Sequence, residues 1–185
     1  PILRGLSVSL QSEIDGNLID DLRQELFAKH PNFALDLAAL NIQRARDHGV
    51  PSYTQARKIY GLSRCRDYTC LTKDKKMIKI LKDLYGENGV SKVDPFVALI
   101  EPKTGNSNLG PLFSAAITEQ MKSLRAGDRF WYERRGVLTR NELREVKRTS
   151  LSDIIKRNTN IKRLPKNIFI VNSKFKLNFS QGYSF

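Results

Sequence analysis

Apolar side chains recur every three to four residues along most of this chain, a spacing typical of amphipathic helices. The pattern therefore predicts a mainly α-helical protein without internal repeats. We expect helices over residues 17–29, 36–48, 52–61, from 72 or 74 to 85, and over 111–125, with two more that begin at residues 139 and 150.

Residues suited to helix ends mark several of these boundaries. Asp36 can accept hydrogen bonds from the first turn of its helix, and Gly49 permits the chain to leave it. Thr139 and Glu142 have the spacing at which two side chains cap a helix start reciprocally, and Ser150 opens a similar sequence. These signals are local, so they predict the ends of helices independently of the rest of the fold.

Two segments lack helical spacing. Residues 87–110 hold most of the turn-forming glycine, asparagine and proline residues, so we expect a loop there. From Ile168 to Phe179, apolar and polar residues alternate, which is a weak strand-like pattern that also suits a packed extended segment.

The apolar side of each helix defines the expected core. We expect the aromatic run 130–132 to belong to that core rather than to a radical relay, because large aromatic side chains dominate protein interiors. The other residues expected to be buried are Met77, Ile78, Leu81 and Leu84 in the lysine-rich helix that ends at residue 85, and Leu112, Ala116, Met121 and Leu124 in the helix over 111–125.

The net charge of +13 raises the question of a nucleic-acid partner. The basic residues are spread over the outer faces of two helices, around residues 73–82 and 140–148, and no zinc-finger, RRM or KH pattern accompanies them. We interpret them as solvated helix faces and regard nucleic acid as an unfavoured partner. No apolar run reaches the roughly 18 residues that a membrane span needs.

The two cysteines, Cys65 and Cys70, leave two interpretations open. They can form a short local disulfide, or they can both remain thiols. A zinc site would need two further ligands, and His30 and His48 do not offer the paired spacing of such sites. The sequence therefore predicts no metal ligands within this chain.

The segment 35–48 carries the clearest candidate chemistry. On a helix, Leu37, Asn41, Arg44 and His48 fall on one face. An amide and a guanidinium on an apolar stripe must each meet a specific partner, because burying either without one costs free energy. The structural alternative is that Arg44 pairs with a carboxylate and Asn41 bonds a loop carbonyl, and spacing alone favours that alternative.

This segment, LDLAALNIQRARDHG over residues 35–49, resembles the signature of the animal haem peroxidase family. Several other segments resemble blocks of that family in the same order, so the resemblance is specific and extends from residue 1 to about residue 172. Those segments are PILRGL (1–6), LGPL (109–112), LRAGDRFWYE (124–133), TSL (149–151) and the turn at 158–159.

The resemblance implies roles for five residues. Asn41 matches the asparagine that accepts a hydrogen bond from the proximal histidine of the haem iron, and Arg44 matches the arginine that pairs with a haem propionate. Leu37 and Leu40 match apolar residues on the proximal side of the pocket. His48 matches a structural histidine and is not expected to bind iron.

The resemblance also implies that this chain is the C-terminal helical part of a longer domain. Residues 1–172 would form that part and 173–185 a tail. The proximal iron ligand, the distal histidine and arginine, and the calcium-binding loop of the family all lie upstream. We therefore expect haem, and the family's calcium, to require the N-terminal half as a partner, and we expect the isolated chain to be inactive.

Three functions remain open. The first is part of a secreted haem peroxidase that reduces hydrogen peroxide and oxidises a halide, phenolic or other donor. The second is a catalytically inactive, secreted or structural relative, and the third is a basic binding module. If the chain is part of a larger domain, the face with Leu37, Leu40, Asn41 and Arg44 should be open or form a groove, because a surface that awaits a partner stays uncovered.

Overall fold

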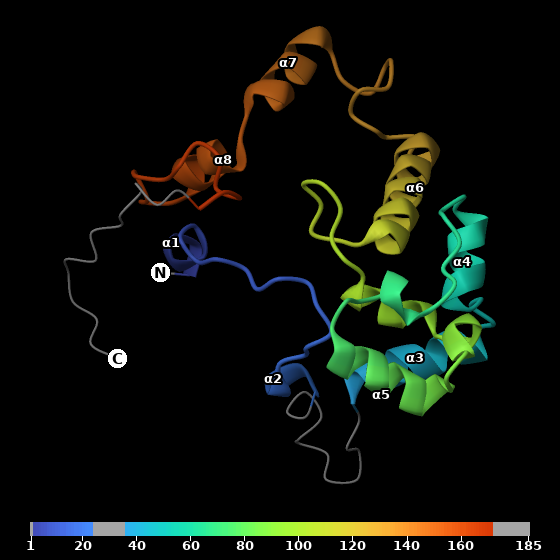
Figure 1. Cartoon of the computed structure of the whole chain (residues 1–185). Helices are drawn as coiled ribbons and strands as arrows, with labels where there is room; N and C mark the ends of the chain where they lie inside the picture. Colours follow the sequence, from blue (N-terminus) through green and yellow to red (C-terminus); the bar gives the residue numbers. More distant parts are fainter. Residues whose placement is uncertain (1, 24–35, 172–185) are drawn as a thin grey trace, which may run out of the picture. The chain divides into compact units, whose positions relative to one another are not determined.

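The computed structural model describes residues 2–23 and 36–171. The regular secondary structure of these residues is helical, without a β-strand (Figure 1). The predicted mainly α-helical class is therefore confirmed. The α-helices are α1 (Ile2–Leu6), α2 (Asp20–Arg23), α3 (Leu37–Asp47), α4 (Tyr53–Ile59), α5 (Lys75–Tyr85), α6 (Pro111–Gly127), α7 (Arg140–Arg148) and α8 (Leu151–Asn158), and the 3-10 helices are η2 (Tyr68–Cys70), η3 (Gly89–Lys92) and η4 (Pro95–Ile100).

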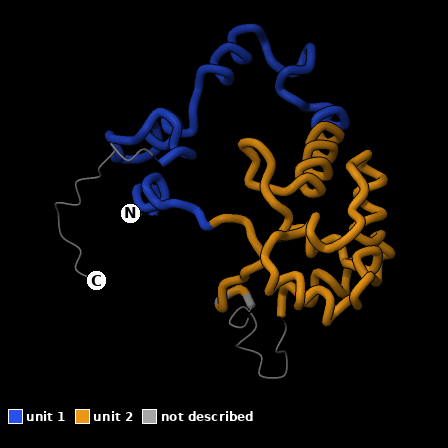
Figure 2. The backbone as a smooth tube through the Cα atoms, in the orientation of Figure 1, with its two compact units in different colours: residues 1–12, 125–185 blue, residues 13–124 orange. Residues whose placement is uncertain are grey.

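The chain divides into two compact units, residues 13–124 and residues 1–12 with 125–185 (Figure 2). The first unit contains α2 to η4 and most of α6. Its core lies between α4, α5, the three 3-10 helices and the start of α6. Core residues are Tyr53, Ala56, Cys65, Tyr68, Leu71, Leu81, Val90, Val93, Ala98 and Leu112.

The second unit contains α7 and α8 and a smaller apolar cluster formed by Ile155, Ile161 and Leu164. The predicted capping pairs are present at both helix starts. Thr139 and Glu142 satisfy each other's backbone and side-chain groups at α7, and Ser150 does the same at α8. Reciprocal capping satisfies backbone N–H groups that have no partner within the helix, so both predicted starts are confirmed.

The predicted starts and ends of the other described helices also lie close to those in the structure. Asp36 caps α3 by accepting from the N–H groups of Ala38 and Ala39, and Asp74, rather than Thr72, caps α5. Gly49 follows α3 with a φ of 65°, a conformation that glycine adopts without steric cost. Of the helix expected over 17–29, the structure describes α2, and residues 24–29 lie outside the described part.

The loop expected over 87–110 is only partly correct, because η3 and η4 lie within it. One or two turns of 3-10 helix contain too few residues to show an apolar period, so the apolar pattern did not predict them. The strand-like pattern from Ile168 is not realised over 168–171. The rest of that pattern, and the tail 173–185, lie outside the described residues.

Several predicted core positions are exposed. Leu81 of α5 is buried, but Leu84 is 73% exposed, and in α6 Leu112 is buried whereas Met121 and Leu124 are 57% and 54% exposed. The aromatic run is not core either, since Phe130 is 67% exposed and its two neighbours are partly exposed. The apolar stripes exist as predicted, but nothing in the described part of the chain covers their outer ends.

Candidate functional site: the exposed face of helix α3

Helix α3 positions the four residues singled out by the sequence. Leu37, Leu40 and Asn41 are partly exposed, Arg44 is exposed, and no residue of α3 is buried. We expected this face of α3 to be open if the chain is part of a larger domain. Within the described residues it is open. Its two polar side chains are presented beside two half-exposed leucines.

Asn41 and Arg44 contact each other. The Nη2 of Arg44 donates a hydrogen bond to the Oδ1 of Asn41 at 2.5 Å, as residues one helical turn apart can. Among the described residues, no carboxylate pairs with Arg44 and no loop carbonyl receives Asn41. Neither contact of the structural alternative is therefore present within the described part of the chain, where both side chains keep hydrogen-bonding capacity.

His48 lies at the end of the same stripe. Its ring Nδ1 is 2.8 Å from the carbonyl oxygen of Arg44, and its backbone N–H donates to the same oxygen. Both contacts end on one carbonyl group, in the last turn of α3. His48 thus contacts the end of α3 rather than the exposed face with Asn41.

The opposite side of α3 is attached to the core through Arg46. Its Nε and Nη2 donate to the two carboxylate oxygens of Asp94, at 2.9 and 2.7 Å, and the hydroxyl of Tyr85 donates to the Oδ2 of Asp94 at 2.7 Å. The hydrogen bond from Arg46 lowers the pKa of Asp94 below its ordinary value and raises the pKa of Arg46. Burial raises the pKa of Tyr85.

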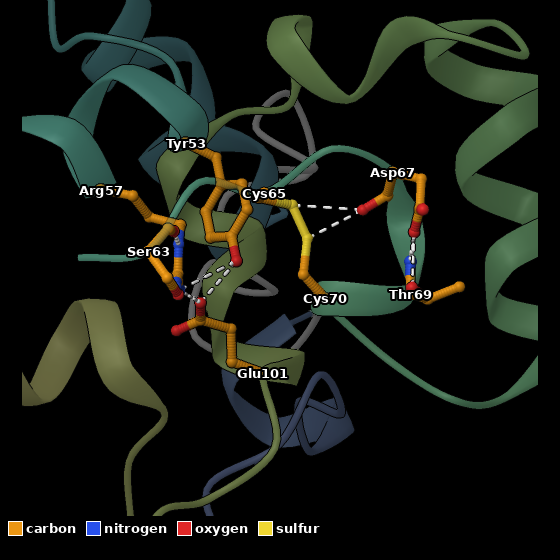
Figure 3. Close-up of a disulfide and its surroundings, with 8 residues drawn as sticks. All are labelled: Tyr53, Arg57, Ser63, Cys65, Asp67, Thr69, Cys70 and Glu101. Atoms are coloured by element: carbon orange, nitrogen blue, oxygen red, sulfur yellow. Dashed lines mark hydrogen bonds and ion pairs between the residues drawn. A yellow bond between two sulfur atoms is a disulfide. The ribbon is translucent and has the colours of Figure 1, made fainter.

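A second polar network lies inside the same unit (Figure 3). The Oε1 of Glu101 accepts from the Tyr53 hydroxyl and from the Nη1 of Arg57, each at 2.5 Å, while its Oε2 accepts the backbone N–H of Leu112 at 2.9 Å. Arg57 also donates to the carbonyl and the hydroxyl of Ser63. Burial, followed by the bond to Glu101, raises the pKa of Tyr53.

The two cysteines are joined in a disulfide, with their Cα atoms 5.8 Å apart (Figure 3). Cys65 belongs to the core of this unit, whereas Cys70 is partly exposed at the end of η2. The backbone carbonyl oxygen of Asp67 lies 3.2 Å from the Sγ of Cys65 and 2.8 Å from that of Cys70. Of the two interpretations left open by the sequence, the structure has the disulfide.

Sequence reasoning missed the Arg46–Asp94 and Glu101 networks. The bonds of Arg46 to Asp94 and of Tyr53 and Arg57 to Glu101 join residues 44 to 48 positions apart, so no local pattern connects them. One signal was available for Arg46, because it lies on the side of its helix away from Asn41 and Arg44. Within the described ranges no cluster of three or more histidine, cysteine or acidic residues could hold a metal ion, and no helix is long and apolar enough to span a membrane.

Residues 1–169 match the family described as animal haem peroxidase. The chain belongs to the animal haem peroxidase family. The family resemblance inferred from the motif over 35–49 is therefore confirmed, and the match extends over both compact units.

Animal haem peroxidases from distant organisms are similar to this chain. A peroxidasin homologue of Caenorhabditis briggsae is 38% identical over 98% of the chain, and human eosinophil peroxidase is 38% identical over 93% of it. The solved structure of peroxidase A from Dictyostelium discoideum superposes on 91% of the chain with a TM-score of 0.79 and 38% identity. The chain spans only 14%, 25% and 32% of the lengths of these three relatives.

Proposed function

We propose that this chain forms the proximal side of the haem pocket in a peroxidase that reduces hydrogen peroxide and oxidises a halide, phenolic or other donor. One observation carries the proposal. The face of α3 that bears Asn41 and Arg44 is open, and within the described residues their side chains bond only to each other. A site that lacks part of its surroundings would look like this.

The chemistry of Arg44 suits a haem propionate. A guanidinium has five N–H donors and matches a carboxylate in a two-pronged geometry, and within the described residues Arg44 makes one contact, to Asn41. When bound, haem would supply the redox chemistry by which its iron reduces hydrogen peroxide by two electrons. Arg44 would hold the cofactor's edge through a charge-assisted bond.

The role proposed for Asn41 is that of a positioning residue. Its Oδ1 can accept the ring N–H of a proximal histidine supplied by residues outside this chain, which would fix the orientation and tautomer of that ligand. In the structure Arg44 donates to this oxygen at 2.5 Å. A propionate that draws the guanidinium of Arg44 toward itself would free the Oδ1 of Asn41 for the histidine.

Leu37 and Leu40 would complete this side of the pocket. Both are partly exposed on α3, where they can cover apolar porphyrin edge without a polar group between them. The proximal and distal histidines and the calcium site would come from the remainder of the domain. Secretion is proposed with the same function.

The test uses the full-length protein that contains this chain, purified with haem. We expect Asn41→Ala to shift the Soret band and Arg44→Ala to lower haem content, with peroxidase rates reduced about 10- to 100-fold, the usual effect of removing a partner of a metal ligand. Gln43→Ala is the matched control, because Gln43 is exposed on α3 and bonds only to Asp47 among the described residues.

Unchanged haem spectra and unchanged peroxidase rates in both variants would reject these roles. If the full-length protein binds no haem at all, the proposal fails as a whole. Two interpretations would then remain: an inactive, peroxidase-like secreted or structural protein that keeps the scaffold, or a basic binding module.

A further inference from the structure

Arg46 lies on the side of α3 opposite the exposed face. At 3.6 residues per turn each residue rotates by roughly 100°, so position 46 is turned by about 180° from position 37. Asn41 and Arg44 both lie within about 40° of position 37 by the same rotation. The side chain of Arg46 therefore leaves α3 on the side away from this pair.

The contact between Arg46 and Asp94 has the geometry of a clamp. Two N–H groups of one guanidinium meet two oxygens of one carboxylate, at 2.9 and 2.7 Å, so the arginine cannot rotate without losing a bond. The side chain of Asp94 is only 9% exposed, and its Oδ2, which accepts from Arg46, also accepts from the hydroxyl of Tyr85. The acceptor is thus held by the core as well as by α3.

A backbone contact reinforces the same connection. The N–H of Tyr53, at the start of α4, donates to the carbonyl oxygen of Val93 at 2.8 Å, and Val93 is fully buried. The chain on both sides of the turn after α3 is therefore tied to two consecutive residues, Val93 and Asp94. Since α3 has no buried residue of its own, these ties substitute for a packed apolar face.

We propose that the Arg46–Asp94 clamp, supported by Tyr85, is the positioning device that sets the rotation of α3 and so aims Asn41 and Arg44 at the haem. This inference rests on the proposed function. None of the three residues touches the cofactor; they act through the helix. The two-pronged geometry of this charged pair defines the rotation of α3 about its axis. Apolar packing does not define that rotation, because α3 has no buried residue.

The experiment compares clamp variants of the full-length holoprotein. Arg46→Lys keeps the charge but removes the fork, Asp94→Asn removes the charge, and Tyr85→Phe releases the support. The control is Lys82→Gln, which breaks an ion pair with Glu87 in the same unit but on α5. Haem dissociation is followed by transfer to an acceptor apoprotein, and the iron–histidine stretching frequency by resonance Raman spectroscopy, both well below each variant's melting temperature.

We expect haem to dissociate about tenfold faster in Arg46→Lys and Asp94→Asn, in the range typical for groups that orient a metal ligand, with a shifted iron–histidine frequency. Tyr85→Phe should have a smaller effect and Lys82→Gln none. In an Asn41→Ala/Arg44→Ala background, Arg46→Lys should add little, because the clamp acts through those two residues.

Two results would overturn the inference in distinguishable ways. If the clamp variants lower the melting temperature but leave haem dissociation and the iron–histidine frequency unchanged while Asn41→Ala alters them, the clamp is only structural and the proposed function stands. If Asn41→Ala and Arg44→Ala themselves leave the haem unaffected, the proposed function fails and the clamp inference fails with it.

Discussion

Arg44 and Arg57 carry the same guanidinium in two different settings of one compact unit. Arg57 is 6% exposed, and its donors reach Glu101, Ser63 and Tyr53. Arg44 is exposed and, within the described chain, bonds only to Asn41. A network whose members satisfy one another serves the fold, whereas a pair with unused donors on an open face is suited to bind something else.

Breaking the buried network of Glu101, Tyr53 and Arg57 should lower stability the most. Glu101→Gln leaves the guanidinium of Arg57 buried beside a neutral group, which typically costs about 3–5 kcal/mol when one partner of a buried pair is removed. Chemical unfolding of the full-length protein measures this loss. Glu13→Gln, which breaks an exposed ion pair with Lys103, is the control and should change little. An equally small change in Glu101→Gln would contradict the structural role of this network.

Removing the Arg46–Asp94 clamp should lower stability by an intermediate amount, and this loss should depend on pH. The pKa of Asp94 is lowered from 3.8, first of all by the hydrogen bond from Arg46. Its stabilising contribution is therefore fully present above about pH 4 and is lost as the pH falls through the lower, folded-state value.

Thermal unfolding of the wild-type protein and of Asp94→Asn at a series of pH values tests this expectation. The difference in melting temperature between the two should be constant from pH 7 to about pH 5 and should shrink below about pH 4. A difference that grows on acidification would show that the carboxylate of Asp94 is not the stabilised form.

Breaking the exposed pair of Asn41 and Arg44 should change stability the least. Arg44→Ala removes an exposed side chain that makes one contact within the described part of the chain, so the free energy of unfolding of the haem-free protein should change by about 0.5 kcal/mol or less. The same variant should still impair haem retention, as proposed above. A large loss of stability without haem would make Arg44 a structural residue and remove the contrast with Arg57.

Helix boundaries and the stripe on α3 were predictable because they depend on close neighbours in sequence. Asp36, Thr139 and Ser150 cap helices whose free N–H groups lie within three residues, so the sequence alone specifies them. The motif over 35–49 likewise identified the family. Burial was predicted less well, since Leu84, Met121 and Leu124 lie on apolar stripes that nothing in the described chain covers.

By itself, the sequence determined that Asn41 and Arg44 share a helical face with Leu37 and Leu40, since a helix's period does not depend on its surroundings. Only the tertiary structure decided that this face is open, that Arg46 meets Asp94 behind it, and that Glu101 closes a network with Tyr53 and Arg57. Those contacts join side chains 44 to 48 residues apart. Charge pairs at such separations form when the core brings their backbones together, and no local spacing encodes that approach.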